Sequence, residues 1–210
     1  SYASGSGSTE LVFRYTIQSG YNDSNGISIG ANALLPNGST IRDAAGNYAT
    51  NLTHDSVTHN SSFKVDTTSP TANFTKATDN VGTVQGDFTS DNTTDDTTLV
   101  LSGTNEAGSS VKVYDNSTEL GTATAADNGT SWSYTATVAN GTTYQFNVRE
   151  TDLAGNTSAA TSNLAVTGDT TAPTAPSVSG TTPTDNTTPT WNWSAGGGGN
   201  GTYRYKLDNN

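Results

Sequence analysis

Large apolar side chains recur at every second position in short bursts along this 210-residue chain. Leu99 with Leu101 is one such burst, and Tyr144, Phe146 and Val148 form another. A period of two places one face of an extended strand against a core and the other face in water. Asn-Gly dipeptides, which are typical of hairpin turns, separate several bursts. No stretch has the 3.6-residue period of a helix, so the sequence predicts an all-β protein with thin cores.

The composition excludes several classes of function. The chain carries 8 basic and 19 acidic residues, a net charge of −11, so we expect no nucleic-acid partner. It has no cysteine, which excludes disulfides, thiol nucleophiles and cysteine-ligated metals. No apolar run reaches the roughly 18–20 residues needed to span a bilayer, so we expect no membrane insertion. Neither a Ser-His-Asp order nor an H-x-x-x-H spacing occurs, and we expect no enzyme activity.

Two short motifs repeat along the chain and divide it into parts. The Asp-Thr-Thr-Ser-Pro run at 66–70 returns as Asp-Thr-Thr-Ala-Pro at 169–173, which is 103 residues later and about one β-sandwich away. A D-x-A-G-N motif occurs at 43–47 and at 152–156, each shortly before such a linker. The phase of the repeats predicts a first and a last domain that are truncated. The predicted parts are the closing strands of a domain at 1–66, a complete domain at 67–168, and the opening strands of a third at 169–210.

These motifs carry a resemblance to a known family. The D-T-T-x-P-T linker, the D-x-A-G-N motif, and the run 101–109 followed by V-K-V-Y-D resemble the bacterial immunoglobulin-like (Big) repeats of giant type I secreted, RTX-type adhesins and biofilm-associated surface proteins. The resemblance implies tandem Ig-like β-sandwiches, an extracellular or bacterial cell-surface location, and structural calcium (Ca2+) at domain junctions. It implies neighbouring repeats of the same chain as partners, with a surface glycan or protein bound through other regions.

Strand direction decides where acidic side chains gather in the complete domain. We expect its strands near 71–76, 98–102, 110–114, 131–138, 143–150 and 161–167. Because the strands alternate in direction, loops collect at two poles. The candidate ligands at the N-terminal pole are Asp66, Glu106, Asp152 and Asn156. Those at the C-terminal pole are Asp79, Asp95, Asp96 and Asp169, and Asp43 with Asn47 form the same motif in the first domain.

Each pole offers the carboxylate and amide oxygens that calcium prefers. The same residue types also start turns by hydrogen-bonding to their own backbone, and that alternative stays open. The sequence therefore predicts a rod of Ig-like repeats, stiffened by calcium at its junctions, that acts as a structural extender of an adhesin in cell adhesion or biofilm formation. Two alternatives are a self-assembling fibre or sheath subunit and a module that itself binds a glycan or a protein.

Overall fold

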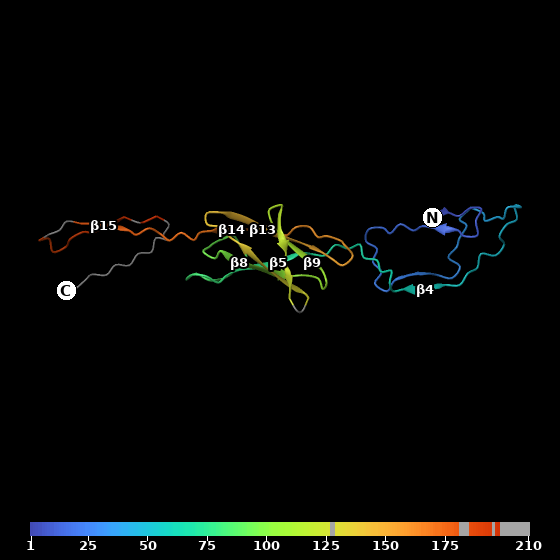
Figure 1. Ribbon diagram of the computed structural model, residues 1–210, viewed down its shortest axis with the longest axis horizontal. Coiled ribbons are helices and arrows are strands. Elements are labelled where there is room, and N and C mark those ends of the chain that lie inside the picture. The colour runs from blue at the N-terminus through green and yellow to red at the C-terminus, as the bar shows by residue number, and fades with distance from the viewer. Residues whose placement is uncertain (127–128, 181–184, 195, 198–210) are drawn as a thin grey trace. The chain divides into compact units, whose positions relative to one another are not determined.

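The computed structural model describes residues 1–126, 129–180, 185–194 and 196–197. The described residues form sixteen strands and no helix, which confirms the all-β fold class (Figure 1). Within them no helix is long and apolar enough to cross a membrane. The chain separates into two compact units. Unit 1 comprises Ser1–Ala72, Asn105–Val111 and Arg149–Ala160, and unit 2 comprises Asn73–Thr104, Lys112–Val148 and Thr161–Asn210.

Two five-stranded sheets are built from residues 73–168. One has the order β10-β9-β13-β14-β7, with β7 parallel to β14. Its strands are β10 (Thr118–Thr122), β9 (Ser110–Asp115), β13 (Thr143–Thr151), β14 (Leu164–Gly168) and β7 (Asn92–Thr94). The other is antiparallel, with the order β11-β12-β8-β5-β6. Its strands are β11 (Thr124–Ala125), β12 (Ser131–Thr137), β8 (Thr98–Thr104), β5 (Asn73–Asp79) and β6 (Gly86–Phe88).

The alternation seen in the sequence produces the core of these sheets. Leu99 and Leu101 of β8 are completely buried, as are Phe146 and Val148 of β13. The Phe146 ring stacks on that of Tyr144, with ring centroids 5.4 Å apart. Strands β8, β9, β12 and β13 lie within two residues of the positions expected from the sequence. Period-two patterning therefore locates the main strands of an Ig-like β-sandwich.

The chain reaches the sandwich at one end and leaves it at the other. Asn73, the first residue of β5, pairs with Thr104. Asp79 at the far end of β5 accepts a 2.7 Å hydrogen bond from Thr94 Oγ1, and Thr94 pairs with Gly168, the last residue of β14. Six residue steps along β5 separate these ends, or about 20 Å. We call the end at Asn73 the N-terminal pole and the end at Gly168 the C-terminal pole.

The described residues before and after the sandwich form no core of their own. In residues 1–72, β1 (Tyr2–Ser4) pairs with β2 (Val12–Phe13) and β3 (Ile27–Ile29) with β4 (Val57–Asn60). Only Gly26 of these residues is buried. After the sandwich, β15 (Ser177–Ser179) pairs with β16 (Asn192–Ser194), and none of the described residues beyond Gly168 is buried. The domain boundaries at 66 and 168 stay predictions.

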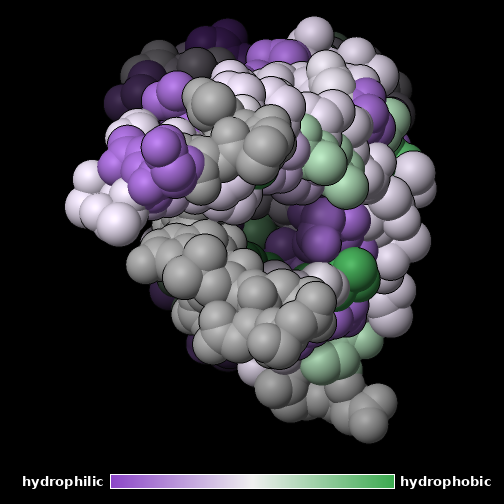
Figure 2. Space-filling view, turned by 90° about the vertical axis from the view of Figure 1, so that its left-hand side faces the viewer, coloured by the Kyte–Doolittle hydropathy of each residue, from purple (hydrophilic) through white to green (hydrophobic). Residues whose placement is uncertain are grey.

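One face of the molecule is largely polar (Figure 2). On the face drawn in Figure 2, hydrophilic residues and residues of intermediate hydropathy predominate over hydrophobic ones. The mean hydropathy of −0.55 agrees with this picture. With few apolar side chains available, stability depends on the small set that the two sheets bury.

Replacing Phe146 by alanine tests this dependence. Removing a fully buried aromatic ring costs its transfer free energy and leaves a cavity, so we expect the free energy of unfolding of the sandwich to fall by about 3–5 kcal/mol. Urea unfolding followed by tryptophan fluorescence measures the loss. Val84, which is 83% exposed, is the control, since Val84→Ala should change the same quantity by less than about 0.5 kcal/mol. Equal effects of the two substitutions would contradict this assignment of the core.

Candidate functional site

The D-x-A-G-N motif at the N-terminal pole forms a loop closed by its own aspartate. Asp152 is 8% exposed. Its Oδ1 accepts the backbone N–H groups of Ala154 and Asn156 at 2.9 and 2.8 Å, and its Oδ2 accepts Asn156 Nδ2–H at 2.8 Å. The hydrogen bond from the Asn156 side chain holds the pKa of Asp152 below its ordinary value, and the backbone N–H groups act in the same direction. Gly155 completes the turn at a φ of 94°.

The earlier copy of the motif has the same geometry. Asp43 Oδ1 accepts the N–H groups of Ala45 and Asn47 at 2.9 Å each, and Oδ2 accepts Asn47 Nδ2–H at 2.9 Å. The Asn47 side chain again lowers the pKa of the aspartate. Two loops in different segments thus form the same hydrogen bonds. The motif is a self-contained turn, which supports the turn interpretation of Asp43, Asn47, Asp152 and Asn156 and leaves metal binding by them a prediction.

The structure brings three predicted residues of the N-terminal pole together. Asn156 Nδ2, which already binds Asp152, also donates to the backbone carbonyl of Asp66 at 3.1 Å. The exposed Asp66 side chain accepts the N–H of Thr68 at 2.9 Å within the linker. The 152–156 loop is therefore in direct contact with the linker. That contact is made by an amide group and a peptide carbonyl.

A buried glutamate that sequence reasoning missed lies behind this pole. Glu150 is completely buried, and its Oε1 accepts the N–H of Glu106 at 2.6 Å and the Ser109 hydroxyl at 2.5 Å. Its Oε2 has no hydrogen-bond partner among the described residues. The Glu106 side chain is exposed, so Glu106 meets Glu150 through its backbone. Glu150 stands two residues after Val148, at the next inward-facing position of β13. This spacing could have predicted a buried glutamate from the sequence.

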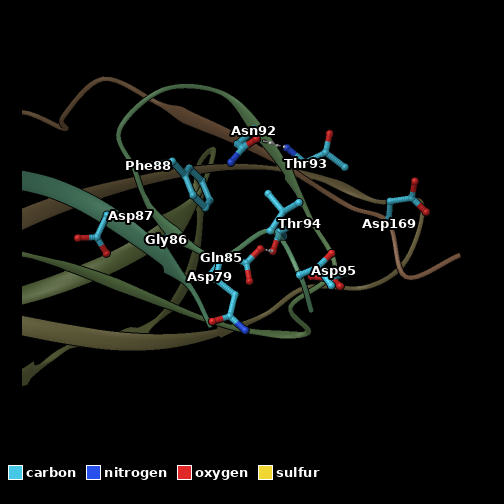
Figure 3. Close-up of a pocket in the computed structure, with 12 residues that line it drawn as sticks. Asp79, Gln85, Gly86, Asp87, Phe88, Asn92, Thr93, Thr94, Asp95 and Asp169 are labelled. Atoms are coloured by element: carbon cyan, nitrogen blue, oxygen red, sulfur yellow. Dashed lines mark hydrogen bonds between the residues drawn. The ribbon is translucent and has the colours of Figure 1, made fainter. Parts of the chain in front are cut away.

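At the C-terminal pole, carboxylates line a cavity of about 350 Å³ in unit 2. Asp79, Asp95 and Asp169, all candidate ligands, are among its lining residues, together with Asp87. Figure 3 shows Asp87 and Asp169 on opposite sides of this group of residues. Asp79 is 7% exposed and accepts the Val81 N–H at 3.0 Å besides the Thr94 hydroxyl. The pole therefore concentrates negative charge around one opening.

Two further acidic residues at this pole, Asp96 and Asp87, are held by hydrogen bonds or by an ion pair. Asp96 is 1% exposed, and its Oδ1 accepts the N–H of Thr98 at 2.7 Å while its Oδ2 accepts the N–H of Asn80 at 3.3 Å. It does not line the cavity. Asp87, which the sequence did not single out, forms an ion pair with Lys76 at 2.5 Å. Hydrogen bonding to Lys76 holds the pKa of Asp87 below its ordinary value.

The donor set suits calcium, but no site is preformed. Calcium in proteins takes six to eight oxygens at about 2.3–2.6 Å, mostly from carboxylates, carbonyls and water. Among the described residues, no group of three or more acidic or histidine side chains is placed to hold one metal ion. The aspartates that line the cavity provide the right chemistry with the wrong spacing. A cation there would require them to move closer together.

Lowering the pH tests the closed loop around Asp152. Because the folded pKa of Asp152 is depressed, its contribution to stability is complete above the unfolded pKa of about 3.9 and disappears as the pH falls through the lower folded value. We expect Asp152→Asn to destabilise the sandwich at pH 7 and to flatten the loss of stability between about pH 5 and pH 2. Urea unfolding at a series of pH values measures both effects. Asp43→Asn is the matched control, and a slope for Asp152→Asn equal to that of the unaltered chain would rule out the role of Asp152.

Comparison with known proteins agrees with the geometry of the central segment. Residues 67–170 match the family model of the bacterial Ig-like domain. No curated protein and no solved structure matches the chain. The matched range contains both five-stranded sheets and ends just after the start of the second linker. In sequence, residues 67–170 are therefore similar to a bacterial Ig-like domain.

Proposed function

We propose that this chain is a structural extender segment of a bacterial extracellular adhesin, in which Ig-like repeats follow one another along a surface protein. One observation carries the proposal. The chain reaches the sandwich of residues 73–168 beside Thr104 and leaves it beside Thr94, at the opposite end of β5. Repeats connected in this way add their lengths, whereas repeats with adjacent termini would fold back on one another.

The repeated linker supports the same role. Asp-Thr-Thr stands before the first strand of the sandwich and again directly after its last strand. A linker of this length leaves little free chain between neighbouring domains, and its proline fixes one φ angle. The proposed role is mechanical and needs no catalytic group. Its proposed partners are neighbouring repeats of the same chain, and its proposed location is the bacterial cell surface.

Calcium at the poles is the second part of the proposal. At the C-terminal pole, Asp79, Asp95 and Asp169 line one cavity, and repulsion between their carboxylates falls when a cation binds. Extracellular calcium modules have dissociation constants of about 10⁻⁴ to 10⁻³ M. At roughly 10 mM calcium one such site adds about 1.4–2.7 kcal/mol of stability. A rod of this kind would gain rigidity outside the cell.

Duplicating residues 67–169 in the full chain tests the extender role. The duplication preserves every linker, because the repeat period is 103 residues. We expect the maximum dimension in small-angle scattering to rise by at least about 20 Å, the length of one strand layer. Side-by-side packing would instead raise the radius of gyration by only about 16%. Light scattering should report a monomer, and assembly at high concentration would favour the fibre alternative.

Calcium titration of the chain tests the second part separately. We expect saturable heat in calorimetry and a rise in the melting temperature of the sandwich, both weakened by Asp95→Asn, since Asp95 is an exposed carboxylate that lines the cavity. Asp55→Asn is the control because it removes the same charge from an exposed position in residues 1–72. Absence of a response to calcium would mean that these aspartates act only as turn residues. The extender role would then be judged by the duplication experiment alone.

A further inference from the structure

The first linker is held by one asparagine of the segment that precedes it. Asn22 Oδ1 accepts the N–H of Thr67 at 3.0 Å, and Asn22 Nδ2 donates to Thr68 Oγ1 at 2.7 Å. The N–H of Thr68 in turn donates to Asp66 Oδ1 at 2.9 Å. The hydroxyl of Thr67 adds a bond to the carbonyl of Tyr21 at 3.0 Å. Thr67 and Thr68 are thus hydrogen-bonded to residues 20–22.

The second linker is held in the same way by an asparagine of the sandwich. Asn140 Oδ1 accepts the N–H of Thr170 at 2.8 Å, and Asn140 Nδ2 donates to Thr171 Oγ1 at 3.0 Å. The N–H of Thr171 donates to Asp169 Oδ1 at 3.0 Å. These three bonds join the same atoms as the bonds from Thr67 N–H, Asn22 Nδ2 and Thr68 N–H in the first linker. We call this set of bonds, one asparagine amide on one Asp-Thr-Thr run, the amide clasp.

Local sequence does not explain the recurrence. Asn22 stands in Tyr-Asn-Asp and lies 45 residues before Thr67, while Asn140 stands in Ala-Asn-Gly and lies 30 residues before Thr170. A carboxamide offers an acceptor and a donor side by side, as this contact requires. A carboxylate would lack the donor. Two independent positions that supply the same group to the same motif indicate that the contact is a feature of the linker.

The first linker also has a contact on its other side. Asn156 Nδ2, from the loop between β13 and β14, donates to the carbonyl of Asp66. Asp66 is thus contacted by a loop of the sandwich, while Thr67 and Thr68 are bound by Asn22. Every group in this chain of contacts is a neutral amide, hydroxyl or peptide apart from the Asp66 carboxylate. None of the contacts requires a metal ion.

We propose that Asn22 and Asn140 are linker-positioning residues, whose amide clasps fix the direction in which the chain leaves the preceding segment without calcium. A fixed linker direction matters only in the proposed extender role, so this proposal rests on that role. It does not depend on the proposed calcium sites. The proposal predicts the solvent-exchange rates of two backbone amides. The N–H groups of Thr67 and Thr170 should exchange slowly with solvent even in the presence of a chelator, although they lie in linkers.

Amide hydrogen exchange of the full chain, measured by NMR in excess chelator, tests the clasp at Asn140. In Asn140→Ala the Thr170 amide loses its acceptor and should exchange at least about fivefold faster, the factor that one net hydrogen bond provides. Thr171→Val keeps that acceptor and removes the hydroxyl that accepts from Asn140 Nδ2 and donates to Asn140 Oδ1 at 3.3 Å, so a smaller acceleration is expected. Asn163→Ala is the matched control, since Asn163 is exposed and outside the linker.

A second readout separates positioning from general stability. The Val166 amide lies in β14, and its exchange together with the melting temperature of the sandwich reports on the fold. Faster exchange at Thr170 with both of these unchanged supports the proposal. Rapid exchange of Thr170 in the unaltered chain, or equal effects of Asn140→Ala and Asn163→Ala, would overturn it. Acceleration at Val166 equal to that at Thr170 would also overturn it, by making Asn140 a structural residue only.

This test and the duplication test fail independently. A chain whose length grows with each repeat, but whose Thr170 amide is unprotected, would be an extender without clasps. A protected Thr170 in a chain whose dimension does not grow would be a clasped linker in a protein of another role. Asn22→Ala, read at the Thr67 amide, repeats the measurement at the first linker and should give the same ratio.

Discussion

One constraint governs this repeat: each five-stranded sheet buries a single face, and the chain has few apolar side chains with which to cover the two faces. Only 30% of residues are hydrophobic, and those that are buried sit almost entirely in β5, β8, β9, β12, β13 and β14. Closing the two sheets over this small core sends every connection to one of two poles. The first strand begins at one pole and the last ends at the other, so the direction of the chain through the repeat follows from the packing.

Polar side chains fix the conformation of the loops that lie outside the apolar core. Asp152 and Asp43 each close a loop by accepting two backbone N–H groups, and Asp96 accepts the N–H groups of Thr98 and of the distant Asn80. Short polar side chains of this kind compete with regular secondary structure and favour turns. The abundance of Asn, Asp and Thr therefore has a structural use beyond solubility. It shapes the poles where linkers and loops meet, and it places there the carboxylates that line the cavity.

The sequence predicted features that depend on local pattern and missed those that depend on distant partners. Alternation located β8 and β13, and the repeated D-x-A-G-N motif predicted two similar loops, which have matching hydrogen bonds. Glu150 escaped notice because a carboxylate at an inward-facing position resembles a break in the pattern until its partners at 106 and 109 are placed. The partners of Asn22 and Asn140 lie 30 or more residues away, so no spacing rule could have paired them.

Neutral clasps and acidic poles would act on the same junction by different physics. Hydrogen bonds between amides, hydroxyls and peptides respond little to salt. Occupancy of a carboxylate site by a cation depends on the cation concentration and is weakened by salt screening. A linker already ordered by an amide clasp has lost much of the conformational entropy that a metal would otherwise have to remove. A cation would then bind more tightly than it would to a flexible linker. Its apparent dissociation constant falls in proportion to the fraction of time that the linker spends in the binding-competent geometry. If the proposed calcium sites exist, order built into the linker would allow even weak sites of this kind to stiffen an array of repeats.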